Sequence, residues 1–199
     1  MKSILKKIGI TLSILIPIIL AIAFLASPFK THEGFDYPLI KQTIIIDAPI
    51  EKVFGYLGNS DNASNWSVFV DHISTINGRE VLDGKVGSER RCFVRKNKQG
   101  MQWDELTTEV IQNKKRQLTI YNLENFPITA QNLATEQIYQ LTNDNKCALS
   151  FTLFYKDVEP TWGEYFKTTF AAYLIKSIFR KNKTQLIKSI SSIKVIYRI

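Results

Sequence analysis

The segment at residues 44–66, IIIDAPIEKVFGYLGNSDNASNW, constrains the fold more than any other part of this chain. It opens with three isoleucines, whose β-branched side chains suit a packed strand. Pro49 then favours a first helical turn, because its φ is close to the helical value and it has no amide donor to lose there. One apolar helical face follows, made of Ile50, Val53, Phe54 and Leu57. The segment therefore predicts a strand that leads directly into a short amphipathic helix.

A second short element is predicted immediately after this helix. Residues 58–61, GNSD, supply a helix stop and a new N-cap. Residues 62–70 then fit a short helical or turn-like segment that carries Trp66. Two short helices are thus expected before the main series of strands.

Six strand-like runs follow Trp66, and turn residues such as Asn77-Gly78 separate them. These runs cover residues 72–80, 87–96, 102–111, 117–123, 129–141 and 147–158. Because the connections between them are short, successive strands are expected to pair antiparallel. Together with the strand that ends at residue 46, they predict a seven-stranded antiparallel sheet.

The hydrophobic period changes after Pro160, where a long helix is predicted. Large apolar residues recur there at every fourth position: Trp162, Phe166, Phe170, Leu174 and Ile178. A helix of about 30 residues would extend about 45 Å, which is more than one crossing of a small sheet requires. The expected fold is therefore of the α+β class, with one long amphipathic helix laid across a curved sheet.

The N-terminal region contains a long uncharged run. Residues 8–26, IGITLSILIPIILAIAFLA, would span about 28 Å as a helix, close to the roughly 30 Å of bilayer hydrocarbon. A transmembrane helix is therefore expected, preceded by a basic leader at residues 1–7. The alternative is a cleaved signal peptide with residues 21–23, AIA, as its cleavage site. The anchor is favoured because the apolar run continues to Ala26.

The sequence around this run predicts how the chain is placed. Residues 27–39, SPFKTHEGFDYPL, contain two prolines and a glycine and are expected to link the helix to a domain at residues 40–199. Three lysines precede the run and acidic residues follow it closely, so the positive-inside rule keeps the N-terminus in the cytoplasm. The domain is then expected to be extracytoplasmic.

The net charge of +8 is concentrated near the C-terminus. Residues 165–199 contain no acidic residue, and their basic residues are Lys167, Lys176, Arg180, Lys181, Lys183, Lys188, Lys194 and Arg198. Such a segment could contact anionic lipid, a protein or nucleic acid. A solvated helix face is the more common explanation, and nucleic acid is not expected as the partner of a membrane-tethered domain.

Few residues are suited to metal or nucleophile chemistry. The two histidines, His32 and His72, are too few for a metal site of three or four ligands or for a histidine-dependent triad. Cys92 and Cys147 could pair in an oxidising compartment, but each lies in a strand-like run where a buried free thiol is expected. No metal and no cofactor is therefore predicted.

Several sequence features together resemble a known superfamily over about residues 40–192. They are the opening motif Ile46-Asp47-Ala48-Pro49 with Val53-Phe54, the pair Asn65-Trp66, the pair Glu109-Val110 ahead of a turn and a new strand at Gln117, and the closing helix. The chain resembles the START-like superfamily, also called the polyketide cyclase/dehydrase and lipid transport family (SRPBCC), and in particular its bacterial members with an N-terminal membrane segment. This resemblance implies the helix-grip fold, in which a bent sheet clasps the C-terminal helix.

The resemblance also implies a cavity for an apolar ligand, because a strongly bent sheet around one helix is not always filled by its own side chains. The aromatic residues expected to line it are Trp66, Phe93, Trp103, Tyr121, Phe151, Trp162, Phe166 and Phe170. Plain core packing is the alternative for each of them, since aromatic residues at such spacings are common in cores. The expected function is the binding of a hydrophobic small molecule or lipid by a membrane-anchored protein without catalysis.

Two other hypotheses remain open. The family includes cyclases and dehydratases, so Asp104, Glu105, Glu109 or Tyr121 could act as acid or base on a hydrophobic substrate. In a regular strand Asp104 and Glu105 point to opposite faces, whereas Glu105 and Glu109 share one. The other hypothesis is an envelope interaction module, in which the basic C-terminal helix docks on a partner or on the membrane surface.

Overall fold

The computed structural model describes the backbone of residues 2–126 and 132–196, and the side chains of residues 11–126 and 132–190. Its elements, in chain order, are α1 (Lys2–Leu25), β1 (Lys30–Thr31), β2 (Pro38–Ile46), α2 (Ile50–Gly58), the 3-10 helix η1 (Ser60–Asn62), α3 (Ala63–Trp66), β3 (His72–Thr75), β4 (Glu89–Phe93), β5 (Gln102–Ile111), β6 (Lys115–Glu124), β7 (Leu133–Leu141), β8 (Cys147–Tyr155) and α4 (Trp162–Ile196). This order confirms the predicted succession of a strand, short helices, further strands and a long C-terminal helix.

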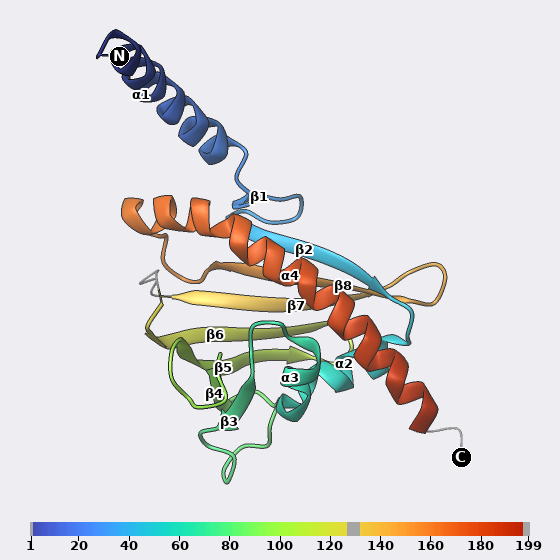
Figure 1. The fold of residues 1–199 in the computed structure, drawn as a ribbon. Coiled ribbons are helices and arrows are strands. Elements are labelled where there is room, and N and C mark those ends of the chain that lie inside the picture. The colour runs from blue at the N-terminus through green and yellow to red at the C-terminus, as the bar shows by residue number, and fades with distance from the viewer. Residues whose placement is uncertain (1, 127–131, 197–199) are drawn as a thin grey trace.

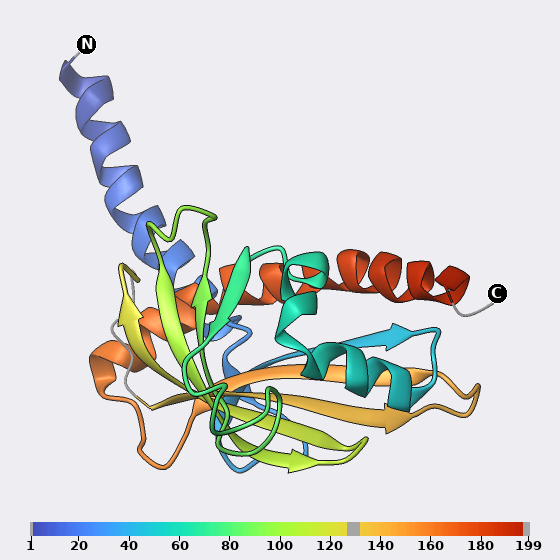
Figure 2. The same ribbon diagram turned by 90° about the horizontal axis from the view of Figure 1, so that it is seen from below.

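The described strands form one antiparallel sheet in the order β1-β2-β8-β7-β6-β5-β4-β3. The sheet has eight strands within the described residues, rather than the predicted seven. The additional strand is β1, because Lys30 and Thr31 of the expected linker pair with Leu39 and Pro38. Figure 2 shows that the sheet is strongly bent and that α4 lies along its concave side. The α+β helix-grip architecture is thus confirmed.

The predicted strands are present, but three of them, β3, β4 and β8, end earlier than expected. β3 stops at Thr75 and β4 at Phe93, and the loops that follow contain residues with positive φ, such as Gly84 at +73° and Lys98 at +59°. These backbone conformations do not continue a strand. The expected beginning of β7 at residues 129–131 lies outside the described residues.

We call the face of the sheet that α4 covers the inner face, and the opposite face the outer face. Leu149 and Phe151 of β8 point inward, as their alternation predicted, and pack with Ile44 of β2. The apolar stripe of α2 joins the same core: Val53, Phe54 and Leu57 are 0–4% exposed. The amphipathic helix predicted after Pro49 therefore closes one end of the inner core.

α4 crosses the inner face and runs along β2 and α3 (Figure 1). Two side chains of α4 tie the segment around α3 to it. The Oδ1 atom of Asn182 accepts a hydrogen bond from the Val68 amide at 2.8 Å, and Ser189 Oγ donates to the Asn65 carbonyl at 2.7 Å. These bonds hold Trp66 beneath the long helix.

α1 begins within the expected basic leader, includes most of the run expected to be a transmembrane helix, and extends away from the domain (Figure 1). The C-terminal end of α1 is attached to α4. The ring centres of Phe24 and Phe166 are 5.9 Å apart, and the Tyr173 hydroxyl donates a hydrogen bond to the Ala23 carbonyl at 2.7 Å. In the described part of the chain, no helix has both the length and the apolar character that a membrane span requires. The transmembrane assignment of residues 8–26 is therefore not shown.

Part of the segment expected to be a linker is packed into the domain. Ser27 Oγ donates to the Thr169 carbonyl of α4 at 2.6 Å. Phe29 is 3% exposed and its ring lies 5.3 Å from that of Tyr165 and 6.2 Å from that of Tyr155. This segment therefore contributes to the core that joins α4 to the sheet.

Both cysteines are free and buried, as expected for thiols in strands. Burial raises the pKa of Cys147 to about 11 and raises the pKa of Cys92 well above its ordinary value. Both thiols are therefore protonated at neutral pH and behave as small apolar core groups.

Candidate functional site

The inner face carries two aromatic clusters beneath α4 and α3. In the first cluster, Phe151 of β8 stacks on Trp66 of α3 at 5.9 Å and on Phe179 of α4 at 5.8 Å between ring centroids. The three rings come from three different elements, so they connect the sheet to both helices. We call them the Trp66 cluster.

The second cluster lies nearer the β4 edge of the inner face. Trp103 of β5 stacks on Phe69 at 5.5 Å and meets Phe126 edge-on at 5.5 Å. We call these three rings the Trp103 cluster. Phe69 follows Trp66 by three residues, so the short segment that begins with α3 supplies a ring to each cluster.

Several apolar side chains of the inner face are incompletely covered. Ile120 and Leu123 of β6 pack against the inner core, and so do Ile175 and Phe179 of α4, yet all four are only partly buried. Leu123 reaches the inner face because Asn122 adopts a φ of +48°, and the β5–β6 register shifts at this point. The bulge changes which face the next side chain occupies. Opposed apolar surface on the sheet and on the helix thus remains accessible.

Trp66 also has an unusual polar atom. Its indole Nε1 is buried and has no hydrogen-bond partner within the described structure. A buried N–H without an acceptor is costly, and such groups usually meet a water molecule or a ligand. An acceptor placed beside the Trp66 cluster would satisfy this donor.

A buried polar network lies beside the Trp103 cluster. Arg90 and Glu105 are each 8% exposed and form an ion pair, with Nη2 and Oε2 2.7 Å apart. Trp103 Nε1 donates to the other carboxylate oxygen at 2.9 Å, and Arg90 Nη1 donates to Ser60 Oγ at 3.1 Å. Because the charges are paired and hydrogen-bonded, this network can remain buried. It fixes the plane of the Trp103 ring.

A second buried arginine lies below α2. The guanidinium of Arg116 is 4.4 Å from the centre of the Phe54 ring, and its Nη1 lies 3.3 Å from both Gln137 Oε1 and the Tyr139 hydroxyl. Burial lowers the pKa of Arg116 from its ordinary value, and burial raises the pKa of Tyr139. The hydrogen-bond acceptors around this cation are neutral groups, and within the described residues it anchors α2 to the sheet without forming an ion pair.

The four proposed acid/base residues do not converge. Asp104 and Glu105 point to opposite faces, as predicted. On the outer face, the Asp104 carboxylate accepts hydrogen bonds from Arg91 Nε at 2.6 Å and from Arg91 Nη2 at 2.8 Å. Tyr121 also lies on the outer face, where its hydroxyl donates to Glu89 at 2.9 Å.

The prediction that Glu109 shares the face of Glu105 is wrong. The register of β5 against β6 shifts between Thr107 and Glu109, so an extra residue reverses the alternation. Glu109 therefore lies on the outer face, with its carboxylate 2.9 Å from Lys115 Nζ. Of the four candidates, only Glu105 points inward.

The eight residues predicted to line a cavity occupy three different regions. Trp66, Trp103 and Phe151 lie on the inner face in the two clusters. Phe93 lies on the outer face, where its ring stacks on His72 at 4.6 Å and Lys98 Nζ lies 5.3 Å above it. Tyr121, the other outer-face member, has a pKa raised to about 12, mainly by burial.

The remaining three, on α4, pack toward α1. The ring centres of Trp162 and Phe166 are 5.6 Å apart, and those of Phe166 and Phe170 are 5.0 Å apart. The ring of Phe24 in α1 lies against both Phe166 and Phe170. Trp162 is 76% exposed. Side chains four residues apart drift by about 40° per step around a helix, so a long series at this spacing cannot stay on one face.

The inner-face residues that the sequence analysis missed are Phe69, Ile120, Leu123, Phe126, Ile175 and Phe179. Phe179 and Ile175 fall on one helical face with Ala172, Leu186 and Ile190, and this alternating three- and four-residue spacing could have identified them. No comparable signal marks Leu123, because its direction depends on a bulge. Within the described residues no group of three or more metal-ligating side chains is placed to hold a metal ion.

Comparisons with known proteins agree with this geometry. A family model described as "Polyketide cyclase / dehydrase and lipid transport" matches residues 38–190. A comparison with curated proteins found no match. Among solved structures, the chain is similar to a Thermobifida fusca protein determined by solution NMR, with a TM-score of 0.59 and 12% identity over 77% of this chain and 93% of that chain.

Two further solved structures are similar to this chain. One is Ara h 8.0201, with a TM-score of 0.54 and 11% identity over 77% of this chain and 97% of that chain. The other is the major latex-like protein 151 of Panax ginseng, with a TM-score of 0.52 and 11% identity over 76% and 95% of the two chains. At these identities the structures show a shared fold alone. Because the family model covers most of the sequence, this chain belongs to the polyketide cyclase/dehydrase and lipid transport family, within the START-like superfamily.

Proposed function

We propose that this protein binds a hydrophobic small molecule or lipid between the sheet and α4, without catalysing a reaction. The family and the fold support either hydrophobic-ligand binding or a cyclase-type role. The observation that carries the proposal is the inner face beside Phe179 of the Trp66 cluster, where partly buried apolar side chains of β6 and α4 pack against one common core. An apolar ligand would remove this surface from water, which is the main favourable contribution to such binding.

The orphan indole of Trp66 favours a ligand that also carries a hydrogen-bond acceptor. Its Nε1 is buried with no partner among the described groups. A carbonyl, hydroxyl or ester oxygen of the ligand would satisfy it at no cost to other contacts. This requirement separates a lipid or polyketide-like molecule from a pure hydrocarbon.

The proposal also includes attachment to a membrane through α1. In its support, the helix stands clear of the domain in Figure 1, and apolar side chains are exposed along it, for example Ile14 at 59% and Ile22 at 60%. An exposed apolar helix in water is unfavourable, whereas the same surface is stabilised in lipid. The proposed orientation places the N-terminus in the cytoplasm and the domain on the other side. If so, cysteine labelling from outside intact cells should modify an exposed cysteine introduced at Lys181 and not one at Lys2.

Ligand binding can be tested with the domain at residues 27–199 and the neutral apolar probe N-phenyl-1-naphthylamine. Ile120→Asn places a polar group on the inner face and should weaken probe binding by about 10-fold. Ile45→Asn is the matched control, since Ile45 lies on the outer face and is 47% exposed. Binding that is absent from the unaltered domain, or equally weakened in both variants, would contradict the proposal.

Native mass spectrometry of the purified chain tests the acceptor requirement. If a lipid co-purifies, Trp66→Phe keeps the ring stack but removes the donor, so retention of the lipid should fall about 5- to 10-fold. Equal retention by both proteins would show that the indole N–H does not contact the ligand.

A cyclase-type enzyme is the second candidate, and one observation favours it. Glu105 is an inward-pointing carboxylate beside the Trp103 cluster, although Arg90 and Trp103 occupy its oxygens. If catalysis takes place here, Glu105→Gln should abolish turnover of a hydrophobic substrate while the probe still binds. Turnover that persists in this variant would exclude Glu105 as the acid or base.

A further inference from the structure

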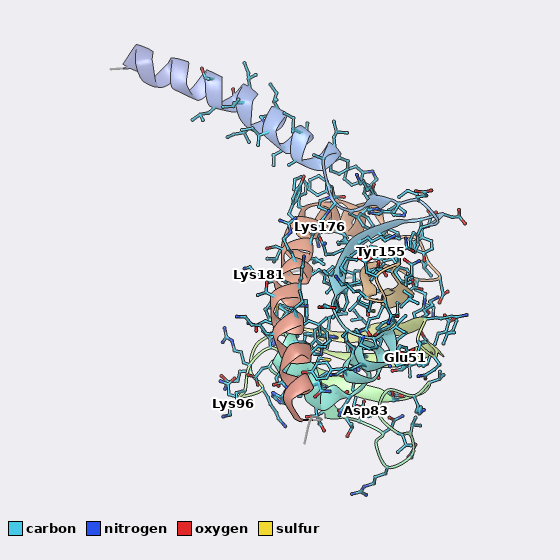
Figure 3. All side chains as sticks on the ribbon, turned by 90° about the vertical axis from the view of Figure 1, so that its right-hand side faces the viewer. Glu51, Asp83, Lys96, Tyr155, Lys176 and Lys181 are labelled. Carbon is cyan, nitrogen blue, oxygen red and sulfur yellow. The ribbon has the colours of Figure 1, made fainter. Side chains whose placement is uncertain are left out.

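A cationic depression lies where the N-terminal segment joins the domain. It has a volume of about 520 Å³ and is lined by His32, Glu33, Lys41, Gln42, Thr43 and Lys176. The loop after β1, the strand β2 and the helix α4 thus each contribute to it. Lys176 lies near the middle of α4, and Figure 3 shows it nearer to α1 than Lys181, which lies further along the helix. Its lining contains no ring of the Trp66 or Trp103 cluster, although Gln42 is the cross-strand partner of Phe151.

The lysines around this depression are not neutralised by the protein. Lys41 and Lys176 form no ion pair with any carboxylate in the described part of the chain. Lys41 Nζ lies instead 5.1 Å from the centre of the Phe35 ring, a contact that leaves its charge intact. Among the lining residues Glu33 is the one carboxylate, and it is exposed. The depression therefore carries an excess of positive charge.

His32 reports this excess directly. Its pKa is lowered by burial and by the positive charges of Lys30, Lys41 and Lys176, while a hydrogen bond to the Pro28 backbone opposes the shift. Its Nε2 atom is buried and has no hydrogen-bond partner within the described residues. Burial and the cationic neighbours thus both oppose protonation of the imidazole, and its Nε2 has no partner among the described groups.

An anion with several oxygens would meet all of these features. Ammonium groups and an imidazole N–H are common donors to phosphate oxygens, and charge-assisted hydrogen bonds of this kind are the strong ones. A cation would be repelled by the lysines, and an apolar group would leave the polar lining unpaired. We propose that the depression formed by His32, Lys41 and Lys176 binds a phosphate group, with Lys30 adding to its attraction.

The phosphate could belong to a lipid headgroup or to a soluble molecule. The depression adjoins the start of the domain just after α1, so a headgroup would be close if α1 is inserted in a bilayer. The site itself is argued from the lining residues alone and does not depend on ligand binding at the inner face. Experiments can therefore separate it from the proposed function.

The test uses the two histidines of the full chain, His32 and His72. The imidazole resonances are followed by NMR against pH, with the protein in maltoside micelles and with inorganic phosphate as the probe. A bound phosphate should raise the His32 midpoint by about one pH unit, because an adjacent anion stabilises the imidazolium. The His72 resonances serve as the control and should not respond to phosphate, since His72 lies on β3 and outside the lining of the depression. Affinity for phosphate should accordingly increase as the pH falls through the His32 midpoint.

A second arm replaces the micelles with phosphatidylcholine nanodiscs, with and without phosphatidic acid. A His32 shift with inorganic phosphate supports a soluble phosphate source, and a shift only with phosphatidic acid supports a lipid headgroup. Lys41→Gln/Lys176→Gln should abolish either response. Lys181→Gln/Lys188→Gln, which removes two exposed charges from α4 outside the lining, should retain it. No His32 shift in either arm, or equal losses in both double variants, would overturn the proposal.

Discussion

Trp66 and Trp103 both belong to aromatic clusters of the inner face, but their indole N–H groups are in opposite situations. Trp103 Nε1 donates to the buried Glu105 carboxylate at 2.9 Å, whereas Trp66 Nε1 has no partner within the described structure. A satisfied buried donor stabilises the fold, while an orphan donor lowers its stability and makes a ligand acceptor favourable. The same residue type thus has a structural role at one position and a candidate binding role at the other.

This difference predicts unequal effects of one substitution. Trp103→Phe leaves a lone pair of Glu105 without its donor and should lower the free energy of unfolding by about 1–2 kcal/mol more than Trp66→Phe. Both variants lose the same part of the indole, so each serves as the control for the other. Urea unfolding of the domain at residues 27–199 measures the difference. Equal losses would show that the bond to Glu105 contributes no net stability.

The Asp104 carboxyl on the outer face makes the stability of the fold depend on pH in the acid range. Burial raises its pKa, but hydrogen bonds from Arg91 and Asn122 outweigh burial, and the pKa lies below its ordinary value. A carboxyl group with a lowered folded pKa stabilises the protein above its unfolded pKa of about 4, and this stabilisation is lost as the pH falls through the folded value.

The corresponding variant is Arg91→Ala. Without Arg91, burial of Asp104 is no longer outweighed, so the acid-induced loss of stability below about pH 4 should become smaller. The midpoint of urea unfolding, compared between the variant and the unaltered protein from pH 2 to 7, a range of about five units, would show this smaller loss. Arg79→Ala is the control, because Arg79 is exposed and should leave the acid response unchanged. An unaltered acid response in Arg91→Ala would contradict the assigned role of this pair.

At the scale of elements, bulges and loops decide which residues meet. The bulge in β5 moves Glu109 to the outer face, and the one at Asn122 turns Leu123 inward. The loop between β3 and β4 approaches the end of α2 so closely that a Cβ atom on Gly84 would collide with the Gly58 carbonyl oxygen. That loop therefore holds α2 in position above Arg116.

Gly84→Ala should be one of the more destabilising small substitutions in the chain. It combines a φ of +73° with the collision against the backbone of Gly58. Gly34 has a similar φ of +82° but nothing within 4 Å of an added Cβ, so Gly34→Ala isolates the conformational cost. We expect about 1 kcal/mol for Gly34→Ala and about 2–3 kcal/mol more for Gly84→Ala, measured by urea unfolding. Equal effects would mean that the loop moves away freely.

At the scale of the whole molecule, the boundary between the N-terminal helix and the domain falls after Ala26. Ser27 and Phe29 belong to the core that joins α4 to the sheet, whereas Phe24 covers the outer side of α4. In Figure 3 the helix α1 leaves the domain at this junction. The phosphate site proposed above lies just beyond it along the chain.

This boundary predicts a sharp difference between two changes. Deletion of residues 1–26 should leave the domain folded, because the segment from Ser27 onward supplies the core contacts. Phe29→Ala in that domain should cost about 3–5 kcal/mol, since the side chain is 3% exposed. Thermal unfolding followed by circular dichroism tests both. A domain that fails to fold after the deletion would show that α1 contributes to its stability.

Much of the fold could be predicted from local sequence. The isoleucines before Pro49, the apolar stripe of α2, the alternation of β8 and the apolar residues at every fourth position after Pro160 each indicated one element. Antiparallel order also followed from short connections. The family resemblance rested on the same features, and the family model confirms it over residues 38–190.

The site was less predictable, because it depends on where long-range contacts direct each side chain. Bulges at Thr108 and Asn122 reverse the inward and outward alternation, and their positions are set by pairing between β5 and β6. The rotation of α4 is set by its contacts with β2 and α3, so Phe179 faces the sheet while Trp162 faces solvent. Local periodicity therefore determined which elements form and in what order. Only tertiary packing decided which of their faces enclose the candidate site, because a one-residue shift or a partial turn changes a face without changing the element.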